Sequence, residues 1–221
     1  MVQDRMNETT INPRHRFDTY HAGNENLQAV ELMKNLACSG LGHCIFLIGP
    51  SACGKTHLLS AFANTVLANN PDCTILYLRI DDFVSQYVTA LRSNCFSTFR
   101  EKLTSFQLLL LDNVQFALGR EHLIQIIAEA YIQHGKSILM AGDYLLPNFQ
   151  NLPLSVIKLV LPSYSTRYEI VQHQAAEMGI SIETAVLERI AIISKNARQL
   201  RGAILHEHLS QKLLDIDAMN Q

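Results

Sequence analysis

Residues 49–56 read GPSACGKT, a Gly-x-x-x-x-Gly-Lys-Thr pattern that restricts the folds open to this chain. Its glycines allow backbone N–H groups to point inward at an anion, and a following helix adds the positive end of its dipole. An apolar run precedes the pattern at 43–49, and a helix-like stretch follows at 56–68. Strand, glycine-rich loop and helix, in that order, are what a phosphate-binding loop requires. We therefore predict that this loop surrounds the phosphates of a nucleotide.

Two side chains of the loop have a predicted chemical role. Lys55 is expected to reach the β- and γ-phosphates, and Thr56 is expected to offer its hydroxyl to Mg²⁺. The alternative is a chance match in an ordinary glycine turn, against which the flanking strand and helix argue. The predicted cofactor is ATP or ADP with Mg²⁺. The predicted binding residues of the loop are Gly49, Pro50, Ser51, Ala52, Cys53, Gly54, Lys55, Thr56 and His57.

Short apolar runs alternate with helix-length segments along most of the chain. The apolar runs are 43–49, 74–80, 106–112, 137–143 and 156–162, and the helix-like stretches are 56–68, 83–92 and 121–134. This alternation indicates a parallel sheet with helices on both faces. After Pro162 the pattern is amphipathic and helical at 165–178, 183–194 and 197–213. We predict a loose polar lead-in at 1–16, an α/β core with a five-stranded parallel sheet at 17–163, and a small all-helical lid at 164–221.

Composition excludes several classes of protein. Hydrophobic residues make up 48% and charged residues 17%, as in globular proteins with a core. No apolar run approaches the roughly 20 residues of a membrane helix, and the polar start MVQDRMNETT is no signal peptide. The five cysteines lack CxxC spacing, which argues against a disulfide framework or a zinc site. The net charge of −2 gives no overall basic field for nucleic acid. We expect a cytoplasmic protein with reduced thiols.

The segment LLLLDNVQF at 108–116 supplies the next candidate residues. Asp112 ends an apolar run, where a carboxylate can hold Mg²⁺ through water opposite Thr56. Asn113 stands where an NTPase of this kind often carries a carboxylate that polarises the attacking water, and an amide cannot accept that proton. Either hydrolysis is impaired, or Asn113 merely caps the strand end and the water is positioned elsewhere. The residues alone leave both interpretations open.

Several segments together resemble the AAA+ module of DnaA, the bacterial replication initiator. They are NPRHRFDTYHAGNENLQAV (12–30), the phosphate loop followed by THLL, FREKL (99–103), LLLLDNVQF (108–116) and NARQLRGAI (196–204). The resemblance implies an AAA+ fold in which residues Phe17 to Gly23 wrap the adenine. It also makes Asp143 the sensor after the fourth strand and Arg198 the lid arginine that contacts the γ-phosphate. From spacing alone, Arg198 would be a solvated helix arginine.

With these roles, the predicted catalytic residues are Asp112, Asn113, Asp143 and Arg198. The predicted Mg²⁺ ligands are Thr56 and Asp112, and the resemblance adds Phe17 and Gly23 to the nucleotide-binding residues.

The resemblance assigns residues 82–102 to the insert that contacts single-stranded DNA in DnaA proteins. The segment carries the cations Arg92, Arg100 and Lys102 together with the aromatic residues Tyr87, Phe96 and Phe99. Such a mixture can hold phosphates and stack bases. A pair of amphipathic helices whose aromatic residues face the core explains the same pattern. We favour the second interpretation and keep single-stranded DNA as an alternative partner.

Departures from the DnaA pattern shape the predicted function. The chain ends at Gln221, so we expect no helix-turn-helix domain and no sequence-specific binding of duplex DNA. Residues 144–161 contain no arginine for a neighbour's ATP site, and Lys158 is their only cation. The residue pairs 112–113 and 142–143 are closer to Hda, the short DnaA homologue that regulates initiation.

These features together predict an adenine-nucleotide-binding AAA+ protein of the DnaA/Hda type. It is expected to regulate the initiation of DNA replication through a DnaA-like partner, as a monomer or small hetero-complex away from membranes. ATPase activity is expected to be weak or dependent on the partner. The alternatives are an ATP-dependent loader of a replicative helicase, and a mobile-element accessory that targets DNA-bound proteins.

Overall fold

The computed structural model describes residues 9–117 and 119–219, which form two compact units. The first unit contains residues 9–20, 29–49 and 55–159 and holds the sheet. The second contains residues 21–28, 50–54 and the chain from Val160 onwards, and it is helical. The helical unit thus includes two short segments that the sequence placed in the core. No helix in the described part of the chain is long and apolar enough to cross a membrane.

The first unit is built on a five-stranded sheet in the order β2–β3–β4–β1–β5, with every pair parallel. The strands are β1 (Cys44–Ile48), β2 (Ile75–Arg79), β3 (Leu108–Asp112), β4 (Ser137–Gly142) and β5 (Ser155–Lys158). Strands β3 and β4 are buried at every position, which explains their continuous apolar runs. The predicted α/β fold with a five-stranded parallel sheet is confirmed.

The fifth strand is shorter than the run 156–162 that predicted it. Strand β5 ends at Lys158, and Leu159 adds one further bond from its N–H to the Ile48 carbonyl oxygen at 2.7 Å. In the helical unit the side-chain amide of Asn26 donates to the Val160 carbonyl oxygen at 3.0 Å and accepts the Val160 N–H at 2.9 Å. The main-chain N–H and C=O of Val160 therefore bond to a side chain and not to a neighbouring strand, and the chain leaves the sheet at this point.

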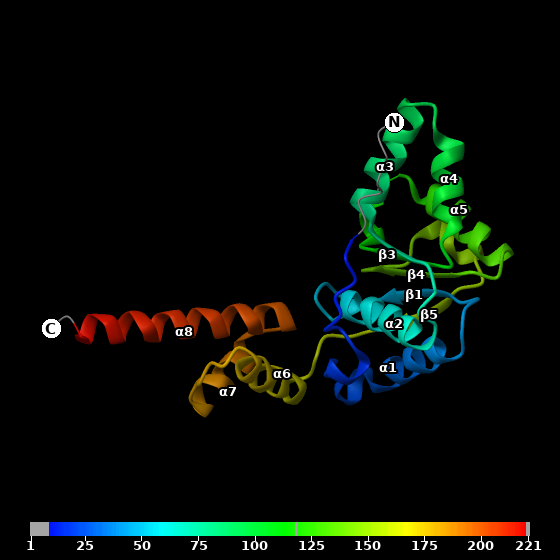
Figure 1. The fold of residues 1–221 in the computed structure, drawn as a ribbon. Helices are drawn as coiled ribbons and strands as arrows, with labels where there is room; N and C mark the ends of the chain where they lie inside the picture. The colour runs from blue at the N-terminus through cyan, green and yellow to red at the C-terminus, as the bar shows by residue number, and fades with distance from the viewer. Residues whose placement is uncertain (1–8, 118, 220–221) are drawn as a thin grey trace. The chain divides into compact units, whose positions relative to one another are not determined.

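Helices cover both faces of the sheet within the first unit (Figure 1). Helix α2 (Lys55–Asn69) and the part of α1 (Gly23–Cys38) from Ala29 onwards lie on one face, while α3 (Ile80–Arg92), α4 (Phe96–Ser105) and α5 (Glu121–Gln133) lie on the other. Short 3₁₀ turns occur at η1 (Phe17–Thr19), η2 (Val114–Ala117) and η3 (Pro147–Asn151). The core between α5 and the sheet includes Tyr131 of α5 and the strand residues Phe46, Leu111 and Met140, none of which is exposed.

Residues 9–16 are attached to the first unit, in contrast to the loose lead-in expected from the sequence. The side-chain amide of Asn64 on α2 donates to the carbonyl oxygens of Asn12 and His15, at 2.9 and 2.8 Å. One half-buried amide thus satisfies two main-chain groups of this polar segment and fixes it. Residues 1–8 of the predicted lead-in lie outside the described residues.

The second unit packs α6 (Tyr164–Glu177), α7 (Thr184–Ile193) and α8 (Ala197–Met219) around a small apolar core. Val171, Ala191, Leu200 and Ile204 form the centre of that core and are fully buried. Ser163 caps α6, because its hydroxyl accepts the N–H of Thr166 at 3.3 Å. These three helices correspond to the three amphipathic segments that follow Pro162 in the sequence.

Candidate nucleotide-binding site

The predicted phosphate loop joins strand β1 to helix α2, as its sequence context requires. Strand β1 ends at Ile48 and α2 begins at Lys55. Between them, Ala52 and Gly54 adopt positive φ angles of 61° and 105°, and the N–H of Cys53 donates to the Pro50 carbonyl oxygen at 3.3 Å. Left-handed residues in a tight turn bring successive N–H groups to one side, which is the backbone form of an anion-binding concavity.

The ammonium group of Lys55 is buried at the carboxyl end of the sheet, with the side chain only 6% exposed. Its Nζ donates to the Gly49 carbonyl oxygen at 2.6 Å and to Asp143 Oδ1 at 2.8 Å. Asp143 directly follows β4, which ends at Gly142, so the predicted sensor and the predicted phosphate lysine meet. A buried ammonium must be compensated by acceptors, and phosphate oxygens are acceptors of the same kind.

The Asp112 carboxylate lies at the centre of the site and is 2% exposed. Its Oδ2 accepts the Thr56 hydroxyl at 2.6 Å and the Tyr77 hydroxyl at 3.1 Å, and its Oδ1 accepts the Asn113 N–H at 2.9 Å. The two residues predicted to hold Mg²⁺ are therefore in direct contact. A buried carboxylate beside a hydroxyl at a strand end is a donor set that suits Mg²⁺.

Tyr77 is a site residue that sequence reasoning missed. It lies on β2 opposite Leu110 of β3, two positions before the pairing of Arg79 with Asp112, so Tyr77 and Asp112 share one face of the sheet. Burial, reinforced by the charge of the Asp112 carboxylate, raises the pKa of the Tyr77 phenol. The phenol therefore stays protonated and donates to the carboxylate. Its signal in the sequence was a single tyrosine inside the apolar run at 74–80.

Asn113 has a backbone role in the structure. Its φ is +60°, the left-handed region that asparagine tolerates better than most other residues. Its carbonyl oxygen accepts the N–H of Phe116 at 3.0 Å, which starts the turn η2. This geometry favours the interpretation of Asn113 as a strand-end residue, and it leaves the effect of the missing carboxylate on hydrolysis as a prediction.

Gly142 is required by the close approach of η2 to the end of β4. A Cβ at this position would lie 2.9 Å from Val114 Cγ2 and 3.2 Å from Phe46 Cζ. Any larger residue would push these side chains apart or displace β4. Because Asp143 comes next in the chain, such a displacement would also move the carboxylate that holds Lys55.

His57 holds the segment that contains Phe17 against α2. The His57 ring stacks on His15 with centroids 4.5 Å apart, and its Nε2 lies 2.8 Å from the Arg16 carbonyl oxygen. Burial lowers the pKa of His15, which favours the neutral ring in this stack. Phe17 is half-buried at the start of η1. Its contact with an adenine stays a prediction.

Besides the loop residues 50–54, two predicted site residues belong to the helical unit, Gly23 and Arg198. Gly23 has φ +56°, and a Cβ there would overlap the Thr166 hydroxyl of α6, so only glycine fits. Arg198 is the second residue of α8 and is exposed. Within the described residues its guanidinium forms no ion pair. The structure brings together Gly49, Lys55, Thr56, Asp112 and Asp143, and the roles of Gly23 and Arg198 at a nucleotide stay predictions.

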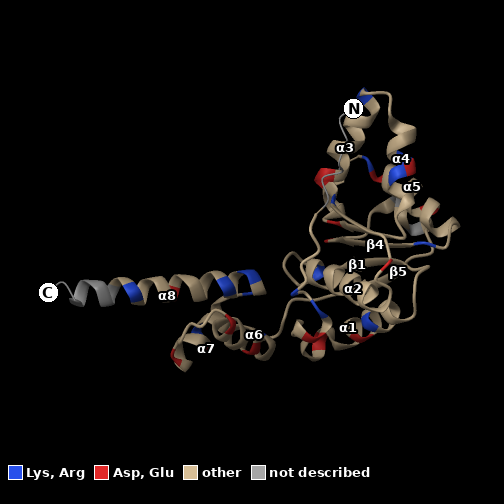
Figure 2. Ribbon diagram, in the orientation of Figure 1, with Lys and Arg blue, Asp and Glu red and all other residues tan. Residues whose placement is uncertain are grey.

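The segment 82–102 forms most of α3 and α4. Tyr87 and Phe99 are partly buried and pack against the main core, whereas Phe96 is 39% exposed. Most of these aromatic side chains therefore face the core, which supports the interpretation of the segment as a pair of amphipathic helices. Figure 2 shows acidic and basic residues mixed on these helices, with no continuous basic face along them.

The sequence family described as the bacterial DnaA ATPase domain matches residues 11–154. The chain belongs to this DnaA family. Its match covers the lead-in segment, the phosphate loop, the Asp112 strand and the end of β4, which are the parts that build the site described above.

Individual DnaA proteins are similar over nearly the whole chain. The chromosomal replication initiator DnaA of Neisseria meningitidis is 28% identical over 233 residues, which cover 96% of this chain and 45% of that protein. The chain thus spans about half the length of the curated DnaA relatives that it matches.

Solved DnaA structures share the fold. Domain III of the Thermotoga maritima DnaA superposes with a TM-score of 0.84 at 27% identity, covering 94% of this chain and 92% of that one. AMPPCP-bound DnaA from Aquifex aeolicus gives 0.75 at 28% identity, covering 89% and 65%. A replication initiator DnaA bound to AMPPCP and single-stranded DNA gives 0.76 at 26% identity, covering 94% and 70%. The predicted AAA+ fold and the resemblance to DnaA are confirmed.

Proposed function

We propose that this DnaA-family chain binds ATP or ADP with Mg²⁺ through the loop 49–57 and Asp112. The observation that carries the proposal is the 2.6 Å hydrogen bond from Thr56 Oγ1 to Asp112 Oδ2, which joins the two predicted Mg²⁺ ligands. The DnaA structures that hold AMPPCP, an adenine nucleotide, support the same choice of ligand. Bound Mg²⁺ would neutralise phosphate charge at this position.

The side chains around the loop have separate tasks in this proposal. The Lys55 ammonium would exchange its contact with Asp143 for phosphate oxygens, and so would bind the nucleotide through charge-assisted hydrogen bonds. The Tyr77 hydroxyl holds the Asp112 carboxylate in place as a positioning residue. Asp143 would respond to nucleotide binding because its carboxylate loses the Lys55 ammonium as a partner when the phosphates bind.

We further propose that the nucleotide-bound chain docks on a DnaA-type partner and thereby regulates the initiation of replication. The support is the asymmetry of its sequence, which keeps the phosphate loop and carries no arginine in residues 144–161. An arginine supplied to a neighbour's site can raise the rate of phosphoryl transfer by roughly 10³ to 10⁵. A subunit that offers a nucleotide but no such arginine is suited to one end of an assembly.

Slow hydrolysis by the isolated protein follows from the same site. We expect turnover well below about 1 per second, under the usual enzyme range, because no carboxylate stands at position 113. Asn113→Asp keeps a residue that tolerates the left-handed backbone and supplies a carboxylate, so turnover should rise about tenfold or more. Phosphate release measured with purified protein tests both expectations.

Two controls separate the chemistry from the backbone in this experiment. Asn113→Gly preserves the φ of +60° without a carboxylate and should leave turnover unchanged. Lys55→Ala reports any contaminating ATPase. Wild-type turnover of about 1 per second or faster, or an equal gain in Asn113→Gly and Asn113→Asp, would show that the missing carboxylate does not limit the reaction.

A further inference from the structure

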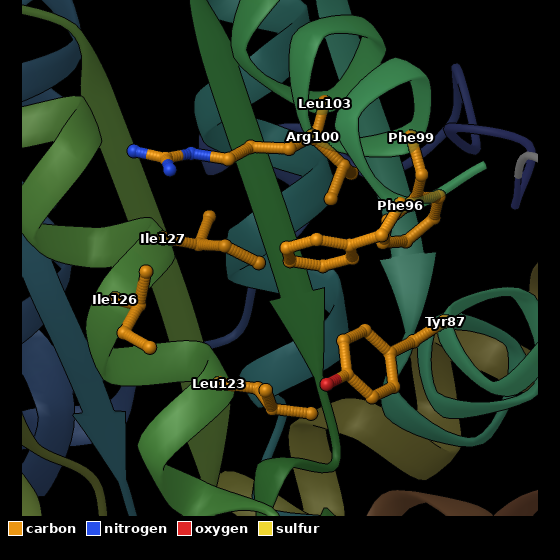
Figure 3. A pocket seen from close by; sticks show the side chains of 8 residues that line it. All are labelled: Tyr87, Phe96, Phe99, Arg100, Leu103, Leu123, Ile126 and Ile127. Carbon is orange, nitrogen blue, oxygen red and sulfur yellow. The ribbon is translucent and has the colours of Figure 1, made fainter. Parts of the chain in front are cut away.

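An open apolar pocket with a cavity volume of about 30 Å³ lies between α4 and α5 (Figure 3). Its floor is formed by buried aliphatic side chains, Leu103 of α4 and Leu123 and Ile127 of α5. Pockets that bind small ligands begin at about 300 Å³, so this shallow pocket suits contact with the surface of a larger partner better than a free small molecule. None of these residues belongs to the nucleotide site.

Exposed apolar side chains continue the pocket onto the surface. Phe96 is 39% exposed and Ile126 is 45% exposed, and both line the pocket. The Tyr87 ring packs edge-on against Phe96 at 5.6 Å and against Phe99 at 6.3 Å, so the aromatic wall is fixed. A pocket with an exposed apolar rim is typical of a docking site for another molecule.

Arg100 is the only charged residue among those that line the pocket. In Figure 3 its guanidinium extends past Ile127, beyond the apolar side chains. It forms no ion pair with any residue in the described ranges 9–117 and 119–219. Since an arginine fork pairs best with a carboxylate or a phosphate, the ligand should carry one negative group beside an apolar one.

The surroundings favour a carboxylate over a nucleic acid backbone. Glu101 follows Arg100 directly on α4, so the charges next to the pocket are of both signs. Binding to a row of phosphates depends on several cations along a groove. One arginine beside an aliphatic floor suits a peptide better.

We propose that this pocket binds a short amphipathic helix of a partner protein. The helix would pack one apolar side chain against Phe96 and Ile126 and place an aspartate or glutamate against Arg100. Recognition of this kind uses an apolar anchor at helical spacing and a charge that sets its orientation. The proposal is independent of whether the chain binds a nucleotide.

The test uses random peptides of about 12 residues displayed on phage, enough for three turns of a helix, with the full chain as target. Selected peptides should combine a bulky apolar residue with Asp or Glu. By fluorescence polarisation, Ile126→Asp and the milder Ile126→Ser should each weaken these peptides about tenfold or more. Arg100→Glu should weaken them similarly, and changing the acidic residue of the peptide to lysine should restore binding. Arg92→Glu, at an exposed cation of α3 outside the pocket, should have little effect.

Three outcomes would overturn the proposal. One is the failure of any peptide to be enriched on the wild-type chain. Another is equal affinity of the selected peptides for wild type and Ile126→Ser, which would place them elsewhere. The third is an oligothymidylate that displaces the peptides and itself depends on Ile126 and Arg100, which would make the pocket a site for nucleic acid.

Discussion

Replacing Lys55 by alanine should weaken ATP binding about 100-fold or more. The ammonium is 6% exposed and already makes two short hydrogen bonds to oxygen atoms in the site. Charge-assisted hydrogen bonds contribute roughly 1.5 to 3 kcal/mol each, and the loss of two corresponds to at least about 3 kcal/mol, or two orders of magnitude in Kd. Isothermal titration calorimetry with ATP and Mg²⁺ measures this change directly.

The control for this variant is Lys34→Ala, which removes an exposed lysine from α1. Its ATP affinity should equal that of the wild type. The Lys55→Ala protein should remain folded, because Asp143 is 36% exposed and water can solvate its carboxylate once the lysine is gone. Equal ATP affinity in Lys55→Ala and wild type would contradict the proposed site.

Replacing Asp112 by asparagine should remove most of the benefit that Mg²⁺ gives to ATP binding. The amide has nearly the same volume and can still accept the hydroxyls of Thr56 and Tyr77, but it lacks the charge that attracts a divalent cation. We expect wild type to bind ATP about tenfold or more tightly with Mg²⁺ than with EDTA, and Asp112→Asn to show less than about a threefold difference.

Tyr77→Phe is the matched control, because it removes one hydrogen bond to the carboxylate and preserves its charge. It should keep most of the Mg²⁺ effect, with a loss of about 1 kcal/mol or less in ATP affinity. An unchanged Mg²⁺ effect in Asp112→Asn would show that this carboxylate takes no part in metal binding.

The sheet and the phosphate loop were predictable because both leave a local signal. Strands buried on both faces must be continuously apolar, and β3 and β4 are. The glycine pattern of the loop encodes its own backbone geometry, as the φ of +105° at Gly54 shows. Helix α1 was not predicted, although its buried residues Val30, Met33 and Ala37 have helical spacing in the sequence.

Other features depend on contacts between distant parts of the chain. The end of β5 is set by the Asn26 amide, 134 residues from Val160 in sequence. Tyr77 reaches Asp112 only because β2 and β3 pair in one particular register. Register and long-range side-chain contacts are tertiary properties, and no local periodicity encodes them.

At position 113 both the side-chain chemistry and the backbone conformation bear on which residue is present. The sequence suggested a missing catalytic carboxylate, whereas the structure adds a left-handed backbone that asparagine accommodates. Aspartate tolerates the same conformation, so backbone geometry alone does not require the amide. The choice of asparagine over aspartate is therefore the part that bears on hydrolysis.

The most direct test of the proposed regulatory function is light scattering on this chain mixed with the ATPase domain of a DnaA protein from the same cells. With ATP, we predict a small complex that contains both chains, which is lost without nucleotide and with Lys55→Ala. The chain alone should stay a monomer or small complex in ATP, since a head-to-tail assembly needs two complementary faces. ATP-driven growth of the chain alone into long homo-oligomers, with no complex formed with DnaA, would contradict the account.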